Sequence, residues 1–128
     1  MPKTPELLQN FYNILCRSLV VVSINTSGMI DAIVAGKPVI SLERKEFSKT
    51  QVLAQHYKHM YESNALYVTK TPEEFLETFS KLLSGNDPKK LERENFIKTF
   101  IRPRGLDTNA GEMVVRELES LLENKRKI

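Results

Sequence analysis

Four small polar residues, Asn25-Thr26-Ser27-Gly28, stand between an apolar run and a segment with helical periodicity. At the end of a parallel strand, such a junction leaves backbone N–H groups without partners. Thr26 and Ser27 can donate hydroxyls to phosphate oxygens, and Gly28 lets a ligand approach the backbone. Asn25 can orient either the loop or a ligand. We therefore expect a phosphate site at Thr26, Ser27 and Gly28.

A simpler interpretation of the same residues competes with the phosphate site. Thr26 or Ser27 can cap the helix, and Gly28 can serve close packing alone. The motif is neither a Walker A loop nor GxGxxG. Asp31, one turn further, likewise either complements the helix dipole or accepts hydrogen bonds from ribose hydroxyls. These two roles are compatible.

Two further pairs of residues have types suited to binding. His56 and His59 lie three positions apart, but no cysteine or clear acidic third ligand accompanies them, so we favour structural or exposed roles and expect no metal site. Arg102 and Arg104 flank Pro103, and their guanidinium groups suit an anion. We nevertheless favour solvated arginines or pairing with nearby acids.

The elements that must position these residues alternate between helices and strands. Apolar spacing predicts the fold class α/β, a three-layer Rossmann-like partial domain with a small parallel sheet flanked by helices. The run from Leu19 to Ile24 is nearly all apolar, as in a strand covered on both faces. The expected helices are 5–17, 28–35, 52–60, 72–83, 88–101 and 108–124, and the expected strands are 19–24, 38–42 and 65–69.

Caps are expected at several helix ends. Thr4-Pro5 and Thr71-Pro72 each place a hydroxyl before a proline at the first helical position. Gly36 stands where a left-handed C-terminal cap belongs. A length of 128 residues with 41% hydrophobic content is near the commonest domain size, so one domain over residues 1–128 is expected, as the C-terminal part of a Rossmann-like domain.

Composition narrows the classes of function. The chain has 128 residues and a formal charge of +3, with no general basic stripe for nucleic acid. The single cysteine, Cys16, excludes an internal disulfide and is expected to be buried. There is no apolar run long enough for a transmembrane segment and no secretory signal, so we expect a cytoplasmic protein. The Lys125-Arg126-Lys127 tail reads as a solvated end that can also touch anionic lipid at the inner membrane surface.

Two stretches carry a resemblance to a known family. "INTSGMIDAIVAGKPVISL" and "FIRPRGLDTNAGEMVVREL" resemble the C-terminal domain of GT-B-fold glycosyltransferases of bacterial capsule and surface-polysaccharide synthesis, including CDP-glycerol-type transferases. The chain also resembles the C-terminal half of UDP-N-acetylglucosamine 2-epimerases, which show a similar "SGG…GKPV" pattern. The turn lacks the paired serines or glycines of the best-known relatives.

The resemblance implies a nucleotide-sugar ligand, such as a UDP, CDP or GDP derivative, and no separate cofactor. Its diphosphate would face Thr26, Ser27 and Gly28, its ribose would lie near Asp31, and His56 would reach the nucleotide or the sugar. The catalytic base of inverting members comes from an N-terminal domain, which we expect to be missing here. The catalytic residues are therefore unknown.

Alternatives from other classes stay open. A non-catalytic α/β module that binds a nucleotide or a separate partner chain predicts a large apolar surface on the first or last helix. An epimerase-like enzyme would share the same nucleotide site. The sequence does not decide between a monomer and a homodimer.

Overall fold

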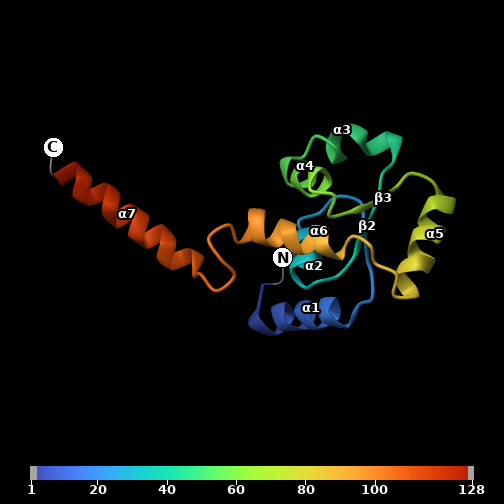
Figure 1. Ribbon diagram of the computed structural model, residues 1–128, viewed down its shortest axis with the longest axis horizontal. Coiled ribbons are helices and arrows are strands. Elements are labelled where there is room, and N and C mark those ends of the chain that lie inside the picture. The colour runs from blue at the N-terminus through green and yellow to red at the C-terminus, as the bar shows by residue number, and fades with distance from the viewer. Residues whose placement is uncertain (1–2, 127–128) are drawn as a thin grey trace.

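The computed structural model describes residues 3–126, with helices around a three-stranded sheet (Figure 1). Its α-helices and strands, in chain order, are α1 (Pro5–Arg17), β1 (Val21–Ser23), α2 (Gly28–Val34), β2 (Val39–Leu42), α3 (Ser48–Gln51), α4 (Gln55–Glu62), β3 (Tyr67–Thr69), α5 (Pro72–Leu83), α6 (Lys90–Phe96) and α7 (Ala110–Arg126). A 3₁₀ turn, η1 (Lys45–Phe47), precedes α3, and a π-helical segment, η2 (Ile97–Ile101), continues α6. The α/β class is confirmed.

The sheet is parallel and follows chain order, β1-β2-β3. Val21 pairs with Val39, and Ile40 pairs with Tyr67, which fixes the register of the two strand pairs. Because all three strands point the same way, their carboxyl ends meet at one edge of the sheet. That edge carries the junction at residues 25–28.

One face of the sheet supports the main core. Val39 in β2 packs with buried side chains from α2, α4 and α6 and with one residue from α1. The buried members of this cluster are Leu15, Met29, Ala32, Ile33, Val39, Tyr57, Met60, Ala65, Leu66 and Phe96. Two of them, Met29 and Ile33, come from α2, so the core holds in place the helix that follows the polar junction.

The opposite face is only partly covered, and the prediction for β1 was wrong there. α5 packs against β2 and β3, so Ile40 is fully buried. Val22 shares this face but lies on the edge strand β1, beyond α5, and is 43% exposed. An apolar run alone cannot distinguish a central strand from an edge strand whose second face is open.

The predicted helix ends are confirmed. Thr4 and Thr71 are N-caps whose hydroxyls accept hydrogen bonds from Leu7 and Glu74 at 3.3 and 3.2 Å. Gly36 adopts φ +74°, and Lys37 donates its N–H to the Ala32 carbonyl at 2.9 Å, which closes the end of α2.

Three other predictions were wrong in detail. The helix expected over 52–60 is α4, which starts only at Gln55 because Ala54 has an extended backbone, and a short helix that was not expected, α3, precedes it. The helix expected over 88–101 starts at Lys90 and becomes π-helical after Phe96. Cys16 is exposed, because it follows the buried Leu15 by one position and so points away from the core side of α1.

The last helix stands apart from the rest. Figure 1 shows α7 projecting away from the body, joined to it by the chain after η2. The apolar side chains of its central turns are exposed. Lys125 is exposed, as expected for the basic tail, whereas Lys127 lies outside the described residues.

No helix in the described range 3–126 is both long enough and apolar enough to cross a membrane.

Candidate functional site at the carboxyl edge of the sheet

The junction after β1 forms a short turn with free polar groups. Thr26 and Ser27 are exposed, and the hydroxyl of Thr26 shares a hydrogen bond of 3.3 Å with that of Ser23. Ser27 is the N-cap of α2, yet its side chain makes no capping hydrogen bond. The capping interpretation therefore does not account for the Ser27 hydroxyl.

The backbone of this turn also has donors to offer. The N–H groups of Met29 and Ile30 bond to the carbonyls of Thr26 and Ser27 at 3.1 and 2.9 Å. Within the described chain, no backbone acceptor is recorded for the N–H groups of Ser27 and Gly28. Since α2 spans only seven residues, its dipole contributes little, and the binding capacity of the turn rests on these N–H groups and hydroxyls.

Gly28 is not required by the fold. Its φ is not positive, and a Cβ built at this position would meet only the Thr26 hydroxyl, at an ordinary contact distance of 3.4 Å. Neither strain nor close packing accounts for glycine here. The absence of a side chain at Gly28 leaves its backbone more accessible than another residue would.

Asn25 and His56 are brought together from positions 31 residues apart. The Asn25 amide nitrogen donates to the Thr50 carbonyl at 3.0 Å, so its Oδ1 must be the acceptor in the 2.8 Å contact with His56 Nε2. His56 then carries a proton on Nε2. Asn25 therefore ties the turn to α3 and α4 while it positions the imidazole beside the turn.

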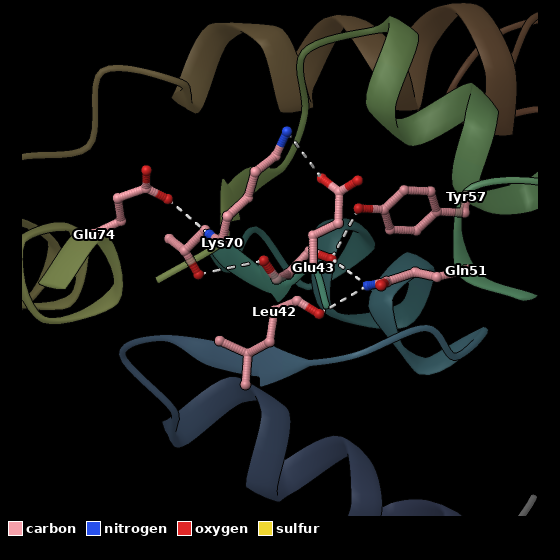
Figure 2. Close-up of polar contacts among 8 residues, drawn as sticks. Leu42, Glu43, Gln51, Tyr57, Lys70 and Glu74 are labelled. Atoms are coloured by element: carbon pink, nitrogen blue, oxygen red, sulfur yellow. Dashed lines mark hydrogen bonds and ion pairs between the residues drawn. The ribbon is translucent and has the colours of Figure 1, made fainter. Parts of the chain in front are cut away.

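Gln51 joins the ends of the first two strands at this edge through hydrogen bonds. It is 1% exposed, and its Nε2 donates to the Ile24 carbonyl. Figure 2 shows its hydrogen bond to the Leu42 carbonyl, at 2.9 Å. A third contact of 3.3 Å reaches the hydroxyl of Ser41. The side chain of Gln51 therefore fills the space at the carboxyl ends of β1 and β2, beside the turn.

Ser41 and Tyr57 continue this buried polar network beneath the edge. Their hydroxyls share a hydrogen bond of 3.0 Å. Burial raises the pKa of the Tyr57 phenol; the hydrogen bond from Ser41 opposes this shift, and the nearby Glu43 carboxylate adds to it. Tyr57 is therefore a neutral hydrogen-bonding group at physiological pH.

A second polar region lies over β2 and β3. A cavity of about 420 Å³ is lined by charged and hydroxyl side chains, namely Glu43, Arg44, Lys45, Glu46, Ser48, Lys70 and Thr71. Lys70 Nζ lies 3.8 Å from the Glu43 carboxylate, while the Lys70 backbone N–H donates to Glu74 (Figure 2). Thr26 and Ser27 are outside this lining, so the edge has two separate polar regions.

Asp31 lies near the turn, whereas Arg102 and Arg104 lie elsewhere. Asp31 is half-buried in the first turn of α2, one turn beyond Ser27. Arg102 donates to the Thr108 carbonyl at 3.4 Å, and Arg104 lies 4.0 Å from Glu117. The two arginines are thus engaged within the chain after η2, away from the junction.

The two histidines do not converge. His56 contacts Asn25, whereas the His59 ring packs on Phe100 with centroids 4.5 Å apart. No group of three or more potential metal ligands occurs among the residues that the structure describes.

Sequence reasoning missed the residues that brace this edge, chiefly Gln51, Ser41 and Tyr57. Ser41 left a signal, because it is a polar residue inside a short buried strand. Gln51 left none, since a glutamine among polar neighbours reads as exposed.

Comparisons of the chain with protein-family models, with curated proteins and with solved structures found no match.

Proposed function

We propose that this chain binds the diphosphate of a nucleotide sugar at the turn Thr26-Ser27-Gly28, as the donor-binding part of a glycosyltransferase of surface-polysaccharide synthesis. The proposal depends on the exposed polar groups of this turn. The Ser27 hydroxyl is exposed and caps nothing, and Gly28 has no packing or conformational reason to be glycine. Such a turn at the carboxyl edge of a parallel sheet suits a phosphate group.

The neighbouring residues support the same ligand. Asp31 follows one turn beyond the proposed diphosphate, within reach of ribose hydroxyls. His56, hydrogen-bonded to Asn25 at 2.8 Å, places an imidazole next to the turn. In this role the chain would stabilise the departing diphosphate through N–H and hydroxyl donors, and a second domain would supply the catalytic base.

Titration of the ¹⁵N-labelled chain with UDP, CDP, GDP and inorganic diphosphate tests this proposal. We expect the amide signals of Ser27 and Gly28 to shift with each ligand. Ser27→Ala should weaken binding about tenfold, because one hydrogen bond to a charged group is worth about 1.5 kcal/mol or more. Ser84→Ala, a serine at the far end of α5, is the matched control and should leave binding unchanged.

Asp31→Asn separates the two halves of the ligand. It should weaken the binding of nucleoside diphosphates relative to that of inorganic diphosphate, because only the former carries a ribose, whereas the loss of negative charge acts on both ligands alike. If the Ser27 and Gly28 amides do not move with any of these ligands at millimolar concentration, the proposed site is wrong.

A second candidate function is an interaction module that works with a separate partner chain. Exposed apolar side chains on α1, on β1 and on the residues that flank β1 favour it, namely Leu7, Leu8, Tyr12, Ile14, Leu19, Val22 and Ile24. This candidate predicts that Val22→Asp abolishes binding to such a partner while nucleotide binding persists. Measuring both activities in one variant distinguishes the two functions.

A further inference from the structure

The apolar side chains of α7 form an exposed stripe with an unusual regularity. The five members are between 53% and 61% exposed. They are Val114, Val115, Leu118, Leu121 and Leu122. Leu118 is the centre, because the other four lie three or four positions before or after it. Residues at these spacings share one face of a helix, so the five side chains form a single stripe.

A helix of this kind depends on packing. An isolated helix of α7's length, 17 residues, is marginal in water, and helices in proteins gain most of their stability from burying an apolar face. Figure 1 shows α7 projecting from the body, and the stripe is open along its whole length. The stability of α7 therefore calls for a surface that covers the stripe.

The order of residues along the stripe indicates what kind of surface packs against it. The segment V-V-R-E-L-E-S-L-L, residues 114–122, has the same pattern of apolar positions when it is read in either direction from Leu118. Two copies laid antiparallel about a two-fold axis at Leu118 would place Val114 against Leu122 and Val115 against Leu121 of the other copy. An isologous interface requires this self-complementarity.

We propose that α7 pairs with α7 of a second copy of this chain, as an antiparallel two-helix interface centred on Leu118. The two-fold axis brings Leu118 against its own counterpart, and every member of the stripe finds an aliphatic partner. The chain is then a homodimer whose two bodies lie at opposite ends of the helix pair.

The size of this interface sets its strength. Five half-exposed aliphatic side chains on each helix bury roughly 900 Å² in total, below the ~1,200 Å² of standard stable interfaces. The dimer should therefore be weak and in exchange with monomer at concentrations on the order of 100 µM.

Salt should strengthen the pairing. Glu117 and Glu119 flank the stripe, and the two-fold axis brings each near its own counterpart; Arg104 lies 4.0 Å from Glu117, so the repulsion between like charges arises mainly on the Glu119 side. Screening by added salt reduces this repulsion. Higher ionic strength should therefore raise the dimer fraction. Salts that strengthen the hydrophobic effect should raise it further, because the interface buries apolar surface.

Sedimentation equilibrium of the full chain measures the association. We expect Leu118→Asp to weaken it by more than tenfold, because the substitution places two facing carboxylates at the centre of the interface. Leu91→Asp, at a leucine of α6 that is 69% exposed, makes the same chemical change elsewhere and should leave the dimer intact. A wild-type chain that stays monomeric at several hundred micromolar would overturn the proposal, as would equal effects of the two variants.

Disulfide trapping tests the geometry without disturbing the fold. In a Cys16→Ser background, which removes the exposed native thiol, Leu118→Cys should cross-link to its own counterpart on oxidation. Ser120→Cys lies on the opposite side of α7 and should not cross-link. Equal cross-linking at both positions, or none at position 118 at a concentration where the chain is dimeric, would show that a different surface covers the stripe and overturn the proposal.

Discussion

Removal of the Asp87 carboxylate should destabilise the protein more than removal of any exposed charge. Arg93 on α6 is 2% exposed, and its guanidinium group holds both Asp87 oxygens, one of them at 3.0 Å. Its Nη1 also donates to the Lys89 carbonyl at 3.2 Å. Asp87 in addition accepts a hydrogen bond of 2.7 Å from the Tyr67 hydroxyl, so one carboxylate joins α6 to β3.

The expected loss of stability follows from the Arg93 charge that remains buried. In Asp87→Ala the Arg93 cation remains buried with the Lys89 carbonyl as its main partner, and an uncompensated buried charge of this kind costs about 3–5 kcal/mol. For a domain whose total stability is about 5–15 kcal/mol, this is a large fraction. In Arg93→Met the buried charge itself is removed, so the loss should be smaller, and the double variant should resemble Arg93→Met.

Urea unfolding followed by circular dichroism measures these differences. Glu77→Ala, which breaks the exposed pair with Lys81, is the control and should leave the midpoint unchanged. A loss below about 1 kcal/mol in Asp87→Ala, or a double variant less stable than both single variants, would refute the argument that a stranded arginine dominates.

The same pair predicts the response to acid. Burial alone would raise the pKa of Asp87, but the hydrogen bonds from Arg93 and Tyr67 and the charge of Arg93 outweigh it and lower the pKa below its usual value. A carboxyl with a lowered folded pKa contributes stability that is present above its unfolded pKa and is lost as pH falls through the folded pKa. The acid limb of the stability curve should therefore be shallower in Asp87→Ala, and an unchanged limb in urea titrations would contradict this.

Three further outcomes are expected. Gln51→Met leaves two part-buried strand-end carbonyls without their donor and should cost about 1 kcal/mol in urea unfolding, whereas Gln55→Met, at an exposed position, should cost little. Gly36→Ala puts a side chain at φ +74° and should cost about 1 kcal/mol, and a neutral result would mean that the backbone there relaxes freely. Burial and the Asp87 hydrogen bond raise the pKa of Tyr67 to about 12, so stability should fall as pH rises from the usual phenol value of 10.0 through about 12. Tyr67→Phe should remove that part of the alkaline loss, which urea midpoints at several pH values would reveal.

Local signals predicted the elements of this fold well. Thr-Pro pairs located the starts of α1 and α5, and Gly36 located the end of α2, because capping depends only on residues a few positions apart. The short apolar runs located the strands, and their alternation with helices predicted a parallel sheet. Each of these features depends on residues that are close together in the sequence.

Contacts between distant segments were not predictable in this way. The sequence indicated Asn25 and His56 as separate candidates, but their hydrogen bond depends on how α3 and α4 return over the strand ends. The burial of Gln51 depends on the same return, and the exposure of Val22 depends on where α5 stops. Each of these facts is a property of packing between elements, for which a single sequence holds no periodic signal.

The hydrogen bonds that hold the turn over α3 end on backbone carbonyls. Asn25 donates to Thr50 and Gln51, and neither bond uses a side chain of the receiving residue. Positions 48–50 can therefore change in residue type without loosening the turn, whereas inserting or deleting a residue between β2 and α3 would move both carbonyls away from Asn25. Across relatives of this protein, positions 48–50 should vary in composition, and the segment from 43 to 50 should keep its length.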